Sequence, residues 1–285
     1  MGTTRQTPWQ HTGAQAVGDL GSALEVQGLR VAKVDVGAVR RGHGVLSDRL
    51  NHVMAAGIDA AILDAESQQD LDTIAASVAS IEKHLFYVGS GGLARGLAKL
   101  NACRDGASAI RLQHPCARVL TVIGTPAEES QRQGVALAEM PQMNELQVTA
   151  RQLEAGRGGN PGYSLPVLVG TLLNQGDLCI RVSDMPQAGS AGRDRQVSMR
   201  LAELIRPYIA QPDGVIVTGG DTARAVLQVL NIDALAVEGE IEPGVVVSRA
   251  KNPRDRIIVT KSGGFGDSHT LIRAYRRLKA LPDTW

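Results

Sequence analysis

The segment Gly214-Val-Ile-Val-Thr-Gly-Gly-Asp-Thr-Ala223 carries the clearest structural signal in this chain. An apolar, β-branched run leads through two glycines and an acidic residue into a helical pattern over 222–230. A run of this length bounded by glycine predicts a buried strand, and the pattern after it predicts a helix. Together they predict one strand–turn–helix unit of a parallel sheet that is covered by helices.

The same unit occurs three more times along the chain. The other copies read Tyr87-Val-Gly-Ser-Gly-Gly-Leu-Ala, Val122-Ile-Gly-Thr-Pro-Ala-Glu-Glu and Val259-Thr-Lys-Ser-Gly-Gly-Phe-Gly-Asp. Glycine allows close backbone approach and positive φ, and the free amides of a helix N-terminus favour an anionic ligand. Because ligands of open parallel sheets bind at the carboxyl ends of strands, the turns predict a phosphate site. A short strand-to-helix connection also uses glycine and an N-cap residue for structural reasons alone. A purely structural role of these turns therefore stays open.

The rest of the chain continues this alternation of short apolar runs with helical patterns. Further strands are predicted at 30–36, 60–64, 85–88, 118–123, 178–182, 234–237, 245–247 and 256–260. Further helices are predicted at 46–55, 71–83, 93–100, 128–140, 193–208 and 270–279. Such an alternation predicts an α/β fold in which each sheet is mainly parallel and flanked by helices.

Length and composition predict two domains, because 285 residues exceed a typical domain of ~100–200 residues. The segment 102–117 is rich in small and polar residues and contains His114-Pro115, so we place the domain boundary there. The chain then divides into a disordered or vector-derived lead-in at 1–15, a first domain at 16–113 and a second domain at 118–285. Within the second domain, 156–163 has no periodicity and is predicted to be a loop.

The overall composition excludes several kinds of partner. Hydrophobic residues make up 43% of the chain and charged residues 21%, as in ordinary globular proteins. With 30 basic and 29 acidic residues, no overall field attracts nucleic acid or anionic lipid, although net charge leaves a local patch open. The longest apolar stretch, 165–173, contains a proline and a glycine and is shorter than the ~20 residues that span a bilayer. The N-terminus lacks the apolar core of a signal peptide. We therefore expect a cytoplasmic protein without a nucleic-acid or membrane partner.

Searches for catalytic and metal-binding motifs exclude further classes. No G-x-x-x-x-G-K-[ST] motif occurs, which excludes a P-loop nucleoside triphosphatase. Gly89-Ser-Gly-Gly-Leu-Ala94 fits G-x-G-x-x-A, but the acidic residue expected ~20 residues later is missing, which disfavours dinucleotide binding. The six histidines form no H-x-x-x-H pair and the three cysteines no C-x-x-C pair. No metal site is therefore predicted, and the cysteines are expected to be reduced. The basic run within 273–279 predicts a solvated helix face, with contact to nucleic acid or phosphate as the alternative.

Three motifs of the second domain carry a resemblance to a known family. They are Thr218-Gly-Gly-Asp-Thr-Ala, Glu238-Gly-Glu-Ile-Glu-Pro-Gly-Val and Thr260-Lys-Ser-Gly-Gly-Phe-Gly-Asp, in this order. Together they resemble the C-terminal nucleotide-binding domain of the four-carbon acid sugar kinase family, also called the type III effector Hrp-dependent outer protein family. Upstream, Leu63-Asp-Ala-Glu-Ser-Gln-Gln-Asp-Leu and Val88-Gly-Ser-Gly-Gly-Leu-Ala resemble the second half of that family's sugar-acid-binding domain.

The resemblance implies an ATP-dependent kinase that phosphorylates a tetronate or 3-oxo-tetronate, with Mg²⁺ neutralising the phosphates. The sugar acid would bind to the first domain and ATP to the second. The nucleotide-binding residues that it implies are Thr125, Gly219, Gly220, Asp221, Thr222, Lys261, Gly263, Gly264 and Gly266. For Asp221 the alternatives are a helix cap or a water-mediated contact with Mg²⁺, and for Lys261 a phosphate or a carboxylate partner. Substrate contacts are expected at Ser90 and Gly91, and the sequence identifies no catalytic base.

The chain departs from the family pattern at its beginning. The family usually opens with an apolar strand that ends in Ala-Asp-Asp-x-Thr-Gly, and this chain contains no such segment. Asp19-Leu-Gly-Ser-Ala is similar, but no apolar strand precedes it. We therefore expect an incomplete first domain with an exposed sheet edge, which favours a homodimer. Little or no kinase turnover is expected, and the alternative function is a non-catalytic nucleotide-binding or interaction module.

A second departure lies in the turn after 118–123. This chain reads Gly124-Thr-Pro-Ala-Glu-Glu-Ser-Gln-Arg-Gln133, where the family usually shows Gly-Ser-x-Ser-x-x-Thr-x-x-Gln. Thr125 keeps a hydroxyl group, whereas Ala127 replaces the second serine. An altered affinity for nucleotide is the expected consequence.

Overall fold

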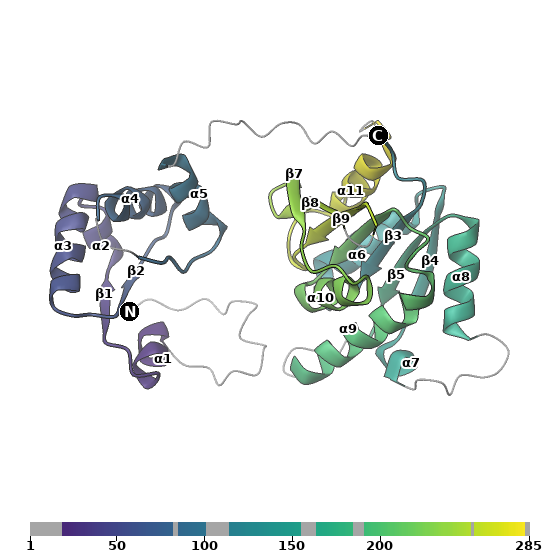
Figure 1. Ribbon diagram of the computed structural model, residues 1–285, viewed down its shortest axis with the longest axis horizontal. Helices are drawn as coiled ribbons and strands as arrows, with labels where there is room; N and C mark the ends of the chain where they lie inside the picture. The colour runs from purple at the N-terminus through teal and green to yellow at the C-terminus, as the bar shows by residue number, and fades with distance from the viewer. Residues whose placement is uncertain are drawn as a thin grey trace. The chain divides into compact units, whose positions relative to one another are not determined.

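The computed structural model describes residues 19–81, 85–100, 114–154, 164–184, 191–251 and 254–282, without the side chains of 191–193. The chain divides into two compact units, the smaller within Ala14–Gly106 and the larger containing Ala107–Trp285. Each unit has its own sheet and helices (Figure 1). The lead-in predicted at 1–15 and the loop predicted at 156–163 lie outside the described residues.

A seven-stranded sheet forms the centre of the larger unit, with the strand order β4-β5-β3-β6-β9-β8-β7. The strands are β3 (Val119–Ile123), β4 (Met143–Val148), β5 (Asp177–Val182), β6 (Gly214–Thr218), β7 (Ala236–Glu242), β8 (Val245–Ala250) and β9 (Arg256–Lys261). The first five strands in this order run parallel, and β8 and β7 are antiparallel at one edge. The prediction of an α/β fold with a mainly parallel sheet is confirmed.

Helices cover both faces of this sheet. They are α6 (Glu128–Ala138), α7 (Ala150–Glu154), α8 (Leu165–Gln175), α9 (Ala191–Ile205), the 3₁₀ turn η2 (Arg206–Tyr208), α10 (Gly220–Val229) and α11 (Thr270–Lys279). Leu120 and Val122 of β3 point into a core shared with α7 to α10, whereas Val119 and Ile123 point into a core shared with α6 and α11. Because both faces are buried, the central strands are continuous apolar runs rather than alternating ones.

The smaller unit is built around two parallel strands, β1 (Val31–Val34) and β2 (Ala60–Leu63). Its helices are α1 (Leu20–Val26), α2 (Val36–Val39), α3 (His43–Ala55), α4 (Gln68–Ala79) and α5 (Gly91–Leu100). Val34, Leu46 and Ile74 belong to its apolar core. A capping box between Ser67 and Asp70 begins α4, so this helix starts where its own side chains satisfy the first amides.

The structure corrects the strand prediction at 85–88, where no strand forms. Phe86 and Val88 are 89% and 83% exposed, and this run pairs with no other strand in the described part of the chain. A β-branched and aromatic run becomes a strand only when a neighbour completes its hydrogen bonds, so propensity alone misleads here.

Sequence patterns also missed three elements of the larger unit. β4 has polar residues at Asn144, Glu145 and Gln147 because it is an edge strand, which weakens the apolar signal. The proline and glycine in 165–173 concealed α8, although Pro166 occupies the first turn, where proline is well tolerated. The third, α7, is only five residues long.

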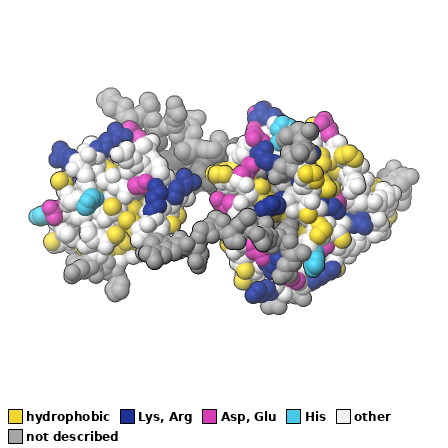
Figure 2. Space-filling model, turned by 90° about the horizontal axis from the view of Figure 1, so that it is seen from above, with side chains coloured by type: hydrophobic (Ala, Val, Ile, Leu, Met, Phe, Trp, Pro, Cys, Tyr) yellow, Lys and Arg dark blue, Asp and Glu magenta, His cyan; other side chains and the backbone are white. Residues whose placement is uncertain are grey.

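Basic and acidic side chains are interspersed on the visible face of each unit in Figure 2. Among the described residues, no helix has the length and apolar character needed to cross a membrane.

Candidate functional site

Three of the glycine turns begin at the same level of the larger sheet. β6 lies between β3 and β9, and all three strands run parallel. The last residues of these strands are in register, because Ile123 pairs with Thr218 and Thr218 pairs with Lys261. The sheet therefore brings the turns after β3, β6 and β9 together at its carboxyl edge, where open α/β sheets bind ligands.

The three turns touch one another, and glycine makes this contact feasible. A Cβ atom added to Gly263 would lie 2.7 Å from Oγ1 of Thr125, and one added to Gly219 would lie 3.1 Å from Cβ of Thr125. Gly219 also has a φ of 90°, a conformation that favours glycine. A Cβ atom at Gly124 would lie 2.5 Å from Oγ1 of Thr222. Thr125, Gly219, Thr222 and Gly263 thus form one cluster, and their part in nucleotide binding stays a prediction.

Several backbone amides at this edge have no partner in the described part of the chain. The amides of Gly263, Gly264 and Gly266 donate no hydrogen bond to any described residue. α10 begins at Gly220 after the N-cap residue Gly219, and no side chain caps its first amides. A Cβ atom at Gly220 or Gly264 would meet nothing within 4 Å. Uncapped amides beside open space are the features with which helix N-termini and glycine turns bind phosphate.

The side chain of Lys261 faces the interior of the unit instead of this open space. It is 3% exposed, and its Nζ donates to the carbonyl oxygens of Ser262 at 2.7 Å, Phe265 at 2.9 Å and Gly263 at 3.2 Å. It also donates to Oγ of Ser130 at 3.1 Å. Burial lowers the pKa of Lys261 to about 8. In this structure its Nζ reaches neither the space above the glycines nor a carboxylate.

The remaining polar residues of the cluster have different surroundings. Thr222 is buried, with its Oγ1 3.2 Å from Oγ of Ser198, whereas Asp221 is exposed on the first turn of α10. One carboxylate oxygen of Asp194, on α9, is buried without a partner among the described residues. Burial and, second, the charge of Asp221 raise the pKa of Asp194. Asp194 therefore belongs to this edge, although no sequence motif marked it.

The far end of the β9 turn is anchored by ion pairs. Arg273 of α11 contacts Glu242 of β7 at 2.5 Å and Asp267 of the turn at 2.9 Å. Arg273, taken from sequence to lie on a solvated basic face, is instead partly buried between two carboxylates. The β7–β8 turn lies next to the same segment, since a Cβ atom at Gly244 would be 2.5 Å from the ring of Phe265.

Ser90 and Gly91 belong to the smaller unit and lie at the beginning of α5. Both are exposed, and the carbonyl oxygen of Ser90 accepts from the amides of Leu93 and Ala94 at 3.1 and 3.3 Å. A Cβ atom at Gly91 would meet nothing within 4 Å. The space beside Gly91 is therefore open, and a substrate contact at this helix N-terminus stays a prediction.

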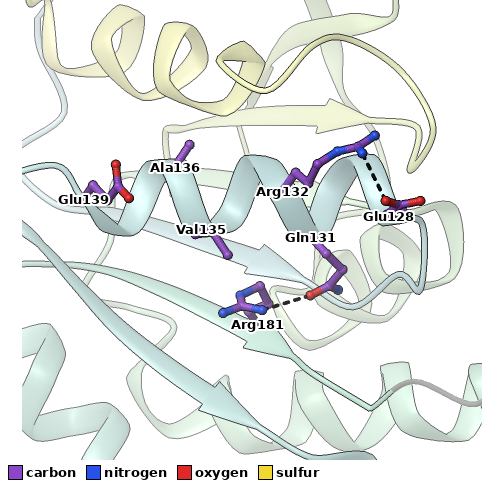
Figure 3. Close-up of a pocket in the computed structure, with 7 residues that line it drawn as sticks. All are labelled: Glu128, Gln131, Arg132, Val135, Ala136, Glu139 and Arg181. Carbon is purple, nitrogen blue, oxygen red and sulfur yellow. Dashed lines mark hydrogen bonds and ion pairs between the residues drawn. The ribbon is translucent and has the colours of Figure 1, made fainter.

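A surface hollow of about 350 Å³ lies beside α6 and contains none of the residues implied by the resemblance (Figure 3). Its lining consists of Glu128, Gln131, Arg132, Val135, Ala136, Glu139 and Arg181. Arg132 pairs with Glu128, and Arg181 pairs with Glu145 and contacts Gln131. Because its arginines are already paired, the hollow offers no basic group for an anion. No group of three or more His, Cys, Asp or Glu side chains suited to a metal occurs among the described residues.

Open α/β sheets commonly bind phosphate groups at glycine turns and helix N-termini on their carboxyl edge, and this chain has both features at that edge. Residues 120–271 match the family model described as the nucleotide-binding C-terminal domain, and residues 4–97 match the sugar-binding N-terminal domain. The chain belongs to the four-carbon acid sugar kinase family.

Curated relatives carry kinase names. A D-threonate kinase of Cupriavidus necator is 32% identical over 274 residues, which are 95% of this chain and 66% of the relative. A 3-oxo-tetronate kinase of Methylobacterium radiotolerans is 28% identical over 261 residues, which are 86% of this chain and 59% of the relative. The chain thus spans about three fifths to two thirds of the length of these relatives.

Solved structures support the fold alone. A protein of Salmonella typhimurium LT2 has a TM-score of 0.67 at 21% identity. The match covers 87% of this chain and 60% of that protein's chain. A protein of Haemophilus influenzae has a TM-score of 0.57 at 19% identity. The match covers 86% of this chain and 60% of that protein's chain.

Proposed function

We propose that this protein is a kinase that transfers a phosphoryl group from ATP to a hydroxyl group of a tetronate or 3-oxo-tetronate. The observation that carries the proposal is the convergence of three glycine turns at one edge of the sheet, where the β9 turn has amides without a partner among the described residues and no side chain caps α10. This edge lies in the segment that matches the nucleotide-binding domain, and relatives of the chain are named D-threonate and 3-oxo-tetronate kinases. Because ATP would be the second substrate, we also propose a cytoplasmic location.

Phosphoryl transfer requires positioning and charge stabilisation more than covalent chemistry from the protein. The amides of Gly263, Gly264 and Gly266 would donate to phosphate oxygens, and those of the first turn of α10 would add the positive end of the helix dipole. The hydroxyl of Thr125 would donate from the neighbouring turn. The sugar acid would bind to the smaller unit, with Ser90 and Gly91 as its proposed contacts.

The surroundings of Asp194 and Asp221 fit the magnesium ion that accompanies ATP. Asp194 has a buried carboxylate oxygen without a partner among the described residues, and the charge of Asp221 acts on it. Carboxylates that keep some water are common Mg²⁺ ligands in phosphoryl-transfer sites. When bound, Mg²⁺ supplies positive charge that offsets the charge of the phosphates.

Calorimetry with ADP and ATP in the presence of Mg²⁺ tests nucleotide binding, and we expect saturable binding by the folded chain. No binding at millimolar nucleotide would remove the proposal. A coupled ADP-release assay with D- and L-erythronate, D- and L-threonate and their 3-oxo relatives then tests the reaction. ADP release that depends on one of these acids supports the kinase. Nucleotide binding without turnover agrees with the low turnover expected from the sequence and leaves the non-catalytic binding module as the alternative.

A further inference from the structure

The carbonyl groups of the turn after β9 point into the larger unit. Besides the three carbonyl oxygens that Lys261 holds, Oγ of Ser130 donates to Gly263 at 2.7 Å. Nε2 of Gln133 donates to the carbonyl oxygens of Phe265 at 3.0 Å and Asp267 at 2.7 Å. We call Lys261, Ser130 and Gln133 the carbonyl clamp. All three are buried, and the two α6 residues lie one helical turn apart.

Peptide geometry links this inner side of the turn to its outer side. In a planar trans peptide, the carbonyl of one residue and the amide of the next point in opposite directions. Inward carbonyls at Ser262, Gly263 and Phe265 therefore turn the amides of Gly263, Gly264 and Gly266 outward. These are the three amides that have no partner among the described residues. The clamp and the proposed phosphate donors are two sides of the same peptide groups.

We infer that Lys261 is a positioning residue for nucleotide binding, which holds the inner face of the turn so that its outward amides match the phosphates. This inference rests on the proposed function. A lysine near a phosphate site ordinarily serves as a direct ligand, but here the ammonium group has four acceptors within 3.2 Å inside the unit. Its charge also lies under the turn, where a cation favours an anion on the opposite face.

The charged groups that face Lys261 are Glu129 of α6 and Glu242 of β7. Glu129 pairs with Arg132 at 2.7 Å and Glu242 with Arg273 at 2.5 Å, so neither is an ion-pair partner of Lys261. The pKa of Lys261 is lowered to about 8 by burial, with both carboxylates opposing this shift. The turn would therefore lose its buried positive charge as the pH rises through 8.

The test compares Lys261→Met with Lys279→Met in the full chain. Lys279 is a matched control because its side chain is 16% exposed and its Nζ contacts the carbonyl oxygen of Ala117 at 3.0 Å and Asp177 at 3.1 Å. Those partners lie at the opposite end of the sheet, where β3 and β5 begin. Thermal unfolding and calorimetric ADP affinity at pH 7 are measured for both variants and the wild type.

We expect both substitutions to lower the unfolding temperature, and only Lys261→Met to weaken ADP binding, by about tenfold or more, as for one lost charge-assisted bond. For the wild type, ADP affinity should fall between pH 7 and 9, whereas for Lys261→Met it should stay flat. A purely structural lysine would not make the affinity depend on pH in this way. ADP affinity within twofold of the wild type in folded Lys261→Met would overturn the inference.

A milder variant keeps the test decisive if Lys261→Met does not fold. Ser130→Ala removes one donor to Gly263 and one acceptor of Lys261. It should weaken ADP binding by about threefold, and unchanged ADP affinity in this variant would count against the clamp. Failure of the proposed function looks different, because the wild type itself would then not bind ADP.

Discussion

Replacing Gly264 by valine tests whether the turn after β9 binds phosphate or only connects β9 to α11. A Cβ atom at this position would meet nothing within 4 Å, and Gly264 is not among the residues with positive φ. The side chain is therefore expected to fit the folded protein and to project into the space proposed for the phosphates. Loss of two charge-assisted amide bonds costs about 3–6 kcal/mol, or at least about a hundredfold in Kd.

The measurement is ADP affinity by calorimetry, paired with the unfolding temperature. Gly44→Val is the matched control, because a Cβ atom at Gly44 on α3 of the smaller unit would also meet nothing within 4 Å. We expect both variants to unfold within a few degrees of the wild type, and only Gly264→Val to lose ADP. Gly263→Val should lose stability as well, since its Cβ atom would lie 2.7 Å from Thr125. Normal ADP affinity in folded Gly264→Val would refute the assignment of the turn.

Three further outcomes follow from the same contacts. Asp194→Asn and Asp221→Asn should each reduce the gain in ADP affinity that Mg²⁺ provides by about fivefold to tenfold. An equal effect of Mg²⁺ on ADP affinity in variant and wild type would exclude these carboxylates as Mg²⁺ ligands. Burial raises the pKa of Cys116 and of Cys179 to about 12, so both thiols should resist alkylation at pH 8 until the protein is unfolded. Rapid alkylation of either thiol in the folded protein, detected by mass spectrometry, would contradict their burial. Phe86→Ser combined with Val88→Ser should weaken the homodimer expected from the sequence, because both side chains are largely exposed. Analytical sedimentation measures the oligomeric state, and a monomeric wild type would contradict this expectation.

The limits of sequence reasoning are clearest in the smaller unit. The apolar run at 85–88 has the composition of a strand, yet it lies exposed without a pairing neighbour in the described part of the chain. Strand formation depends on hydrogen bonds to a second segment, and a local pattern contains no information on whether that segment is present. Helices satisfy their own backbone groups, which is why α3, α4 and α5 were predicted with small errors at their ends.

For the candidate site, local sequence was sufficient to locate each glycine turn, because an apolar run followed by glycines and a helical pattern is a feature of neighbouring residues. Adjacency of the three turns depended on the sheet order, which places β6 between β3 and β9 and aligns their last residues. The direction of Lys261 also required the folded chain, since its partner Ser130 lies 131 residues away in sequence. Contacts of this kind arise from packing between segments that are distant in sequence. The residue pattern alone therefore predicted the turns. Their common edge and the carbonyl clamp beneath it depend on how the strands pair and how the sheet packs against α6.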